Sequence, residues 1–246
     1  MRRGCARRST GRSPTGPPRW PRDMRGWHRV DAVSEVGRIE VGLFDLDLSH
    51  DVLACCHEWL DVDERARAAR FRHDRDRDRF VARRGQLRER LAQSVGEAPR
   101  AVRIAIDARG KPFLLDHPGL HFSVSHSHGQ ALCAVAVDAA VGCDLEWRNP
   151  DLACRAVAAR LFAPPETTAL ANLTEAQWVE GFFNCWTRKE AYVKALGLGL
   201  SYPLDAFAVS VAPGEPATLI DAQPGWSLAS FEPAPGYQAA LVTGTR

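Results

Sequence analysis

The longest regular pattern of apolar positions in the sequence runs from residue 175 to residue 196. Apolar side chains recur there with the spacing of one helical face, which predicts an amphipathic helix. Thr174 and Gln177 form a capping-box pattern at its start, and Gly197 stands where a helix C-terminus favours glycine. One stripe of this helix contains Val179, Phe182, Phe183, Trp186 and Val193.

Two charged residues lie on or beside this stripe. Glu190 falls within it, one turn after Trp186, and Lys194 follows one turn later at its edge. A carboxylate on the core-facing side of a helix requires a cation, a metal or hydrogen bonds, because burying an isolated charge is strongly unfavourable. An ion pair between Glu190 and Lys194 is one explanation, since residues four apart are neighbours on a helix. A functional role for the carboxylate is the other.

Shorter apolar patterns predict β-strands around this helix. Residues 38–46 alternate apolar and polar side chains, as a half-buried strand does, and residues 131–137 form a continuous apolar run, as a buried strand does. The strands are expected at residues 38–46, 102–106, 121–125, 131–137, 141–146, 207–211, 226–231 and 237–242. The tandem of short strands after the long helix favours an α+β fold class over a doubly wound α/β fold.

Further helices are expected in the first half of the chain and before the long helix. Residues 50–60 have the pattern of a short helix, and residues 151–173 that of one or two helices. Residues 61–92 carry a helical stripe of Phe71, Phe80, Leu87 and Leu91. Eleven arginines lie in this last segment, between Arg65 and Arg90, and we expect most of them to form ion pairs on a solvated face.

The first 36 residues differ from the rest in composition. They are rich in Arg, Gly, Pro and Ser without a hydrophobic period, so we expect residues 1–36 to be a disordered extension. Met24 is an alternative start of the chain, and an arginine-rich arm for an acidic partner is an alternative role. Residues 1–29 contribute +8 to a net charge of +2, so the remainder carries −6. The body of the protein therefore gives little support for nucleic-acid binding.

The remaining composition indicates a protein of the cytoplasm. Seven cysteines are scattered without a CxxC pair, which favours reduced thiols over a disulfide framework or a zinc site. No run of 18 apolar residues is present, so we expect no membrane span and no membrane partner.

A pair of acids in the strand at 141–146 is a candidate metal site. Gly142, Asp144 and Glu146 share one face of that strand, opposite its apolar face. Two carboxylates so close repel each other unless a cation lies between them, and hard oxygen ligands suit Mg²⁺. Two acids facing solvent on an exposed strand are the alternative.

Residues that could contact a ligand precede this strand. His126 ends a strand among hydroxyls, and Lys111 is presented by a Gly-Lys-Pro turn. Arg67 and Arg79 could bind phosphates through the guanidinium fork. A Ser-His hydrolase is a poor match, because the sequence has no GxSxG elbow.

Taken together, four blocks resemble the 4′-phosphopantetheinyl transferase superfamily, in its large Sfp-like class. The blocks are residues 110–112, 122–127, 141–146 and 186–194, the last followed by Gly-Leu-Gly-Leu at 197–200. The resemblance covers roughly residues 38–246. It implies an α+β, pseudo-twofold monomer of two similar halves, each a small antiparallel sheet packed with helices. We expect these halves at residues 37–139 and 140–246, the second carrying the metal-binding acids.

The resemblance also implies an activity of the holo-[acyl-carrier-protein] synthase type. Such an enzyme transfers 4′-phosphopantetheine from coenzyme A to a serine of an apo acyl or peptidyl carrier protein, with Mg²⁺ (or Mn²⁺), and releases adenosine 3′,5′-bisphosphate. By this resemblance the metal ligands would be Asp144, Glu146 and Glu190. The coenzyme's phosphates would be bound by Arg67, Arg79, Lys111, Ser125, His126 and Lys194. Glu190, or a water on the metal, would be the base, and Lys194 would approach the pyrophosphate.

Three positions depart from the family pattern, and two alternatives to the transferase function stay open. Cys143 stands where Val or Ile is usual, Ser123 replaces a frequent asparagine, and Glu64 lies near a place where relatives often carry a basic residue. A non-catalytic relative that binds coenzyme A or a carrier protein is the first alternative, and an unrelated Mg²⁺-dependent nuclease or phosphatase the second. Among carriers, those of polyketide and nonribosomal peptide synthesis, in secondary metabolism, are favoured over fatty-acid carriers by analogy.

Overall fold

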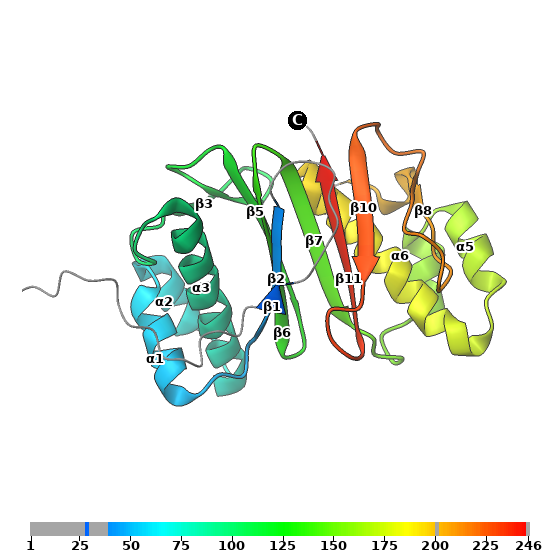
Figure 1. Cartoon of the computed structure of the whole chain (residues 1–246). Helices are drawn as coiled ribbons and strands as arrows, with labels where there is room; N and C mark the ends of the chain where they lie inside the picture. Colours follow the sequence, from blue (N-terminus) through cyan, green and yellow to red (C-terminus); the bar gives the residue numbers. More distant parts are fainter. Residues whose placement is uncertain (1–27, 30–38, 200–201, 245–246) are drawn as a thin grey trace, which may run out of the picture.

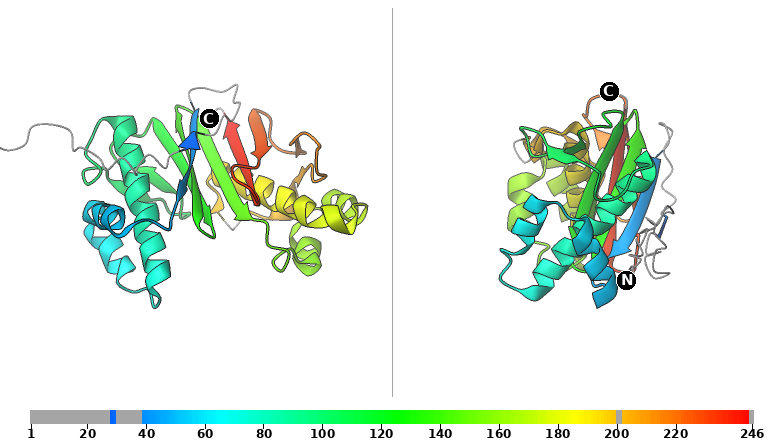
Figure 2. Two further views of the ribbon diagram at one scale, coloured as in Figure 1. Left: turned by 60° about the horizontal axis from the view of Figure 1, so that its bottom comes forward. Right: turned by 90° about the vertical axis from the view of Figure 1, so that its left-hand side faces the viewer.

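The computed structural model describes residues 28–29, 39–199 and 202–244, and it has helices at both ends with strands between them (Figure 1). Two further views show the same arrangement, with helices α1 to α3 at one end and α4 to α6 at the other (Figure 2). Among the described residues, the two larger sheets have four and three strands, and both are antiparallel. The fold is therefore the mixed helix and antiparallel-sheet class that the sequence predicts.

The first half of the chain forms the four-stranded sheet and three helices. The order of its strands is β1-β2-β6-β5, and β3 pairs with β4 in a separate hairpin. Its elements are β1 (His28–Arg29), β2 (Ile39–Asp45), α1 (His50–Trp59), α2 (Val62–Ala68), α3 (Asp74–Val95), β3 (Ile104–Ile106), β4 (Pro112–Leu114), β5 (Leu120–Ser127) and β6 (Gln130–Val137).

The second half forms the three-stranded sheet, in the order β10-β11-β7, and the long helix that lies on it. Its elements are β7 (Ala140–Trp147), α4 (Arg155–Leu161), α5 (Pro164–Ala171), α6 (Glu175–Leu196), the 3₁₀ helix η3 (Leu204–Ala206), β8 (Ala208–Val209), β9 (Leu219–Ile220), β10 (Trp226–Phe231) and β11 (Tyr237–Gly244).

Serines of β5 join the two sheets along β7. The Ser123 hydroxyl accepts a hydrogen bond from the Cys143 amide at 3.0 Å, and the Ser127 hydroxyl accepts one from the Trp147 amide at 3.0 Å. Ser125, between them, donates to the Asp144 carboxylate. Because side chains alternate along a strand, these three hydroxyls project from one side of β5, as its alternation predicts. The residue numbers of the partners rise together, so β5 and β7 run in the same direction at this seam.

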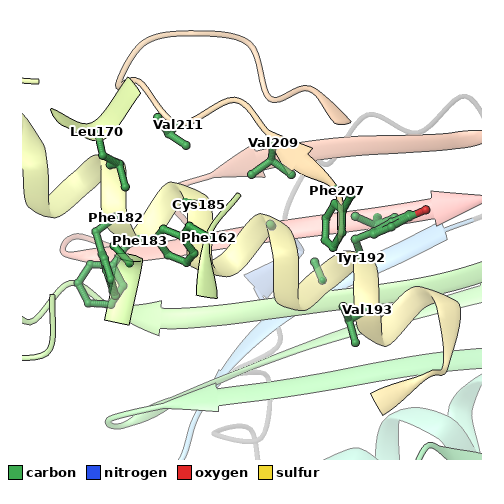
Figure 3. Close-up of a cluster of buried hydrophobic side chains, with 14 of the residues drawn as sticks. Phe162, Leu170, Phe182, Phe183, Cys185, Tyr192, Val193, Phe207, Val209 and Val211 are labelled. Atoms are coloured by element: carbon green, nitrogen blue, oxygen red, sulfur yellow. The ribbon is translucent and has the colours of Figure 1, made fainter. Parts of the chain in front are cut away.

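Helix α6 has the bounds that the sequence predicts, Glu175–Leu196, with the capping box at Thr174 and Gln177 and a left-handed Gly197 at its end. Its apolar side chains form the core of the second half with η3, β8 and the surrounding helices (Figure 3). This cluster includes Phe162, Phe182, Phe183, Tyr192, Phe207 and Val211. A second core lies between α3 and the four-stranded sheet, around Leu87, Leu91 and Phe122.

Several details differ from the sequence prediction. The segment 61–92 is two helices, and Phe71 of the expected stripe lies in the turn between them, 36% exposed. The strand expected at 207–211 is only two residues long. Within the expected N-terminal extension, His28 and Arg29 pair with Leu43 and Gly42 of β2, whereas the rest of residues 1–36 and Met24 lie outside the described residues. The boundary between halves and the pseudo-twofold relation stay predictions.

Candidate active site

The site begins where β7 meets α6. A Cβ atom on Gly142 would lie 2.1 Å from the Ala191 carbonyl oxygen and 2.3 Å from the Ala195 amide nitrogen. Both neighbours are helix backbone and cannot move aside, so only glycine permits this approach. The face of β7 that carries Gly142 therefore packs directly on α6. This contact brings Asp144, two residues along the same face, against the helix.

Asp144 is the centre of a compact polar group. Its carboxylate is 3% exposed, and its Oδ1 atom lies 2.6 Å from the Lys194 ammonium and accepts a hydrogen bond from the Ser125 hydroxyl at 2.7 Å. Lys194 also donates to the Ser125 oxygen at 3.0 Å. Although burial opposes its charged form, the Asp144 carboxylate raises the pKa of Lys194 above its ordinary value. The other carboxylate oxygen of Asp144, Oδ2, is buried and has no hydrogen-bond partner in the described structure.

Two further acids surround this carboxylate. Glu146 is half-buried and accepts a hydrogen bond from the Ser127 hydroxyl at 2.7 Å, and burial together with the charge of Asp144 raises its pKa to about 7. Glu190 is 9% exposed, and burial and Asp144 raise its pKa as well. No hydrogen bond to the Glu190 carboxylate is present within the described residues. Three acids thus share one lysine, and burial followed by the charge of Asp144 raises the pKa of both Glu146 and Glu190.

This set of oxygens fits a hard divalent cation. Asp144, Glu146 and Glu190 are all carboxylates, and the buried Oδ2 atom of Asp144 lacks a partner that a cation would supply. As the side chains stand, with Lys194 on Asp144, no three His, Cys, Asp or Glu groups of the described chain are arranged as a metal site. The metal assignment stays a prediction that the donor chemistry supports.

A positively charged cavity lies beside the acids, on the α3 side of β5. Arg83 Nη1 lies 2.6 Å from His126 Nε2, and Arg67 and Arg83 both stand over the Phe80 ring. Loss of solvation and the charge of Arg83 lower the pKa of His126 to about 4, while burial and neighbouring arginines lower that of Arg83 to about 10. The cavity, of about 440 Å³, is lined by Phe71, Asp76, Arg79, Phe80, Arg83, His126, Ser127 and His128. Arg83 and the neutral His126 imidazole carry no acid as partner in the described structure, and a guanidinium in this position is suited to an anion.

Arg83 is the residue of this cavity that the sequence analysis missed. It lies one turn after Arg79 on α3, so the helical spacing places both arginines on neighbouring parts of one face. The helical spacing of Arg79 and Arg83 could have indicated that they share a face. Nine other arginines between Arg65 and Arg90 made these two hard to distinguish.

Arg79 lines the same cavity but already has partners. Its guanidinium binds the Asp47 carboxylate through two hydrogen bonds of 2.7 and 2.6 Å, and it donates to the His128 carbonyl oxygen at 2.6 Å. The Arg79 guanidinium is therefore fixed beside the loop between β5 and β6. A role in phosphate binding stays a prediction for this residue.

Lys111 lies in a second cavity, on the other side of Ser125. Its ammonium donates to the carbonyl oxygens of Lys194 at 2.6 Å, Ala195 at 3.2 Å and Val141 at 3.3 Å. Lysine thereby satisfies carbonyls at the C-terminus of α6, which the helix itself leaves unpaired. The cavity, of about 430 Å³, is lined by the turn at 109–112, residues 122–124, Lys194, Gly197 and Gly199. Phosphate binding by Lys111 likewise stays a prediction.

Glu64, one of the departures from the family pattern, has a structural role. It is buried, its carboxylate binds Arg84 and Arg88, and it completes the capping box of α2 with Asp61. An acid at this position therefore joins α2 to α3, and it does not line the positive cavity.

Comparison with known proteins places the chain in a family. The model of the 4′-phosphopantetheinyl transferase superfamily matches residues 140–242, from β7 to β11. The 4′-phosphopantetheinyl transferase HetI of Nostoc sp. is 41% identical over 186 residues, which are 74% of this chain and 78% of that protein. The chain belongs to the 4′-phosphopantetheinyl transferase superfamily.

Other proteins are similar to parts of the chain. The 4′-phosphopantetheinyl transferase Sfp of Bacillus subtilis is 27% identical, over 74% of this chain and 81% of its own. A solved holo-(acyl-carrier-protein) synthase of Bacillus anthracis, in complex with CoA, overlaps 44% of this chain and 96% of its own, with 19% identity and a TM-score of 0.36. The resemblance to the Sfp-like class found in the sequence is thus confirmed by the relatives.

Proposed function

We propose that this protein transfers the 4′-phosphopantetheine group of coenzyme A to a serine of an apo acyl or peptidyl carrier protein and releases adenosine 3′,5′-bisphosphate. Its membership of the superfamily supports the reaction class. The observation that carries the proposal is the Asp144 carboxylate, buried against Lys194 with one oxygen unpartnered, between two cavities suited to a coenzyme.

The phosphates of the coenzyme are assigned to the cationic groups on both sides of Ser125. His126 and Arg83 line one cavity without acidic partners of their own in the described structure, and Arg67 stands over the Phe80 ring of its wall, which supports a phosphate monoester there. Arg79 lines the same cavity. Lys111, Ser125 and Lys194 are assigned to the other phosphates, and Lys194 to the pyrophosphate.

Asp144, Glu146 and Glu190 are assigned as ligands of Mg²⁺, with Mn²⁺ as a substitute of the same ligand preference. When bound, the ion supplies a positive charge that offsets the charge of the pyrophosphate oxygens. The unpartnered Oδ2 atom of Asp144 and the raised pKa of Glu146 support this assignment, because both reflect negative charge that the protein alone leaves uncompensated.

The chemical step needs a base and a stabilised leaving group. The carrier serine attacks the β-phosphorus, the bond from this phosphorus to the leaving phosphate oxygen breaks, and adenosine 3′,5′-bisphosphate departs. We assign the serine proton to Glu190, whose raised pKa makes it a stronger base than an exposed carboxylate. The Lys194 ammonium, held beside Ser125, is placed to stabilise negative charge that develops on the phosphate oxygens.

The test is the intact mass of an apo carrier protein after incubation with the enzyme, coenzyme A and Mg²⁺. We expect the mass to rise by one phosphopantetheine group, and the variant Glu190→Gln to lose this modification. Carriers of fatty-acid, polyketide and nonribosomal peptide synthesis form the panel. An unmodified carrier in every case would contradict the proposal, and coenzyme binding without modification would identify a non-catalytic relative.

We further propose that the enzyme works as a monomer in the cytoplasm on carriers of secondary metabolism. The six cysteines of the described chain are all free thiols, which supports a reducing compartment. No helix of the described residues has the length and apolarity needed to cross a membrane. The preference for polyketide and nonribosomal peptide carriers rests on likeness to the Sfp-like class, and the carrier panel tests it directly.

A further inference from the structure

A third cavity, of about 680 Å³, lies on the side of α6 away from the acids. It is bounded by α6, β10 and the loop between β8 and β9, and its lining includes Arg148, Arg188, Glu215, Leu228 and Phe231. Arg188 precedes Glu190 by two residues, about 200° around a helix, so the two side chains leave α6 in opposite directions. Nothing in the proposed transfer reaction uses this cavity.

The position of Arg188 leaves one edge of its guanidinium without a hydrogen-bond partner among the described residues. The side chain is 3% exposed, and Nη1 donates to the Ser210 carbonyl oxygen at 2.6 Å and to its hydroxyl at 3.0 Å. The Ser210 hydroxyl is itself fixed, since it donates to the Pro216 carbonyl and accepts from the Thr218 amide. Nε is buried without a hydrogen bond, and Nη2 makes none within the described residues. The Nε–Nη2 edge is the edge that binds two oxygens of one carboxylate or phosphate.

The charge of Arg188 is only partly offset by its surroundings, because Glu180 and Glu215 line the same cavity and act on it without a direct ion pair. No carboxylate of the described chain lies within ion-pair distance of it, and burial lowers its pKa to about 10. Two of the nearby acids already pair with Arg148: Glu232 closely, and Glu180 at 3.9 Å. Glu215 lies on the loop between β8 and β9 and forms no ion pair with any of the described residues. A buried, oriented and unpaired guanidinium requires a compensating anion, because its desolvation is otherwise unfavourable.

We propose that this cavity binds a small organic oxyanion, a carboxylate or a phosphate monoester, through the Nε–Nη2 edge of Arg188. The apolar part of the ligand lies against Leu228, which is half-buried and lies on the face of β10 that packs toward α6. The assignment does not depend on the proposed transferase activity, since it uses a different face of α6 and none of the coenzyme residues.

The test is isothermal titration of the full chain with two probes, inorganic phosphate and hexanoate. Phosphate reports on the anion contact alone, and hexanoate adds the apolar wall. We expect saturable binding of at least one probe, which Arg188→Lys weakens roughly tenfold or more, because lysine keeps the charge and loses the bidentate fork. Arg83→Lys is the matched control. It alters an arginine of the coenzyme cavity, which is itself expected to bind phosphate, so it should weaken only that component of the phosphate titration and leave the component at the Arg188 site unchanged.

The outcomes separate clearly. Binding that is lost in Arg188→Lys and kept in Arg83→Lys supports the site. Binding that Arg188→Lys leaves unchanged, or saturable binding of neither probe, overturns it. The midpoint of thermal unfolding of each variant is measured first, and Ser210→Ala, which removes one anchor of the guanidinium, provides a second variant if Arg188→Lys does not fold. Ser210→Ala should weaken binding by a smaller factor, and equal affinity to the wild type would count against the proposal.

Discussion

Helix α6 carries two lysines, five residues apart, and each is paired with a buried carboxylate. Lys189 lies 2.8 Å from Glu166, and neither side chain is exposed. Glu166 also accepts hydrogen bonds from the amides of Ala163 and Val209, both at 2.7 Å, and Lys189 donates to the carbonyls of Leu204 and Phe207, both at 2.6 Å. Every polar atom of this pair therefore has a partner.

The pair of Lys194 and Asp144 is equally short, at 2.6 Å, but it is incomplete. Asp144 leaves one buried oxygen unpartnered, and Glu146 and Glu190 add negative charge without a second cation. The difference teaches how to distinguish a structural ion pair from a ligand site in this protein. A buried pair with all its hydrogen bonds joins elements of the fold, whereas a buried pair with charge left over can accept a substrate or metal.

The largest expected effect comes from breaking the complete pair. Lys189→Met leaves the Glu166 carboxylate buried without its cation, and we expect a loss of about 3–5 kcal/mol in the free energy of unfolding. Urea unfolding measures this loss. The double variant Lys189→Met with Glu166→Gln removes the unpaired carboxylate charge and should recover part of the lost free energy of unfolding. A loss below about 1 kcal/mol in Lys189→Met would mean that the pair does not join α5, α6 and η3 as described.

Breaking the incomplete pair should separate stability from activity. Asp144→Asn removes one of three crowded negative charges, so we expect the free energy of unfolding without Mg²⁺ to change by less than about 1 kcal/mol. Transfer to the carrier protein should fall by about a hundredfold or more, as when one preorganised electrostatic group is removed from an active site. Carrier mass analysis and urea unfolding of the same preparation test both parts. Retained activity would exclude Asp144 from the metal site, and a large loss of stability would make it a structural acid like Glu166.

The close contact between β7 and α6 positions the Lys194–Asp144 pair and has no counterpart at the Lys189–Glu166 pair. Gly142→Ala places a methyl group against the backbone of α6, so we expect β7 to shift away and the unfolding free energy to fall by about 1–3 kcal/mol. Activity should fall further than stability, because Asp144 moves relative to Glu190. Gly96→Ala, at a left-handed position with open space around it, is a control for glycine loss without a clash. Equal effects of the two substitutions on activity would contradict the role of the close approach.

The same comparison explains what the sequence could predict. The bounds of α6 follow from local signals, namely an apolar stripe, a capping box and a terminal glycine, and all of them agree with the structure. Glu190 was recognisable because a carboxylate interrupts that stripe. Asp144 and Glu146 were recognisable because strand alternation places them on one face, next to a glycine.

The roles of Lys189 and Arg188 could not be predicted in this way. Their partners are carbonyl groups at residues 204–210 and a glutamate at 166, which only the folded chain brings to α6. Helical periodicity describes one buried face, whereas α6 is covered on nearly all sides, so its polar side is buried as well. For the same reason Arg83 and His126, which are 43 residues apart, meet only in the tertiary structure.

The smallest expected effect concerns the pH dependence of stability and of Mg²⁺ activation at the incomplete pair. The pKa of Glu146 is about 7 in the folded chain, above its ordinary value of 4.5, so the folded state binds a proton more tightly than the unfolded state. The stability that this group contributes is therefore present at pH 5 and is lost as pH rises through 7.

Mg²⁺ requires the deprotonated carboxylate, so the Mg²⁺ concentration for half-maximal transfer should rise as pH falls from 8 to 6, by up to about tenfold per unit below 7. Urea unfolding at pH 5 and 8, with and without Mg²⁺, and Mg²⁺ titrations of the carrier assay measure the two trends. Glu146→Gln should weaken both trends, although Glu190 and Glu89, whose pKa values are also raised, keep part of the stability trend. A pH dependence of Mg²⁺ activation that is unchanged by this substitution would assign the titration to another group of the site.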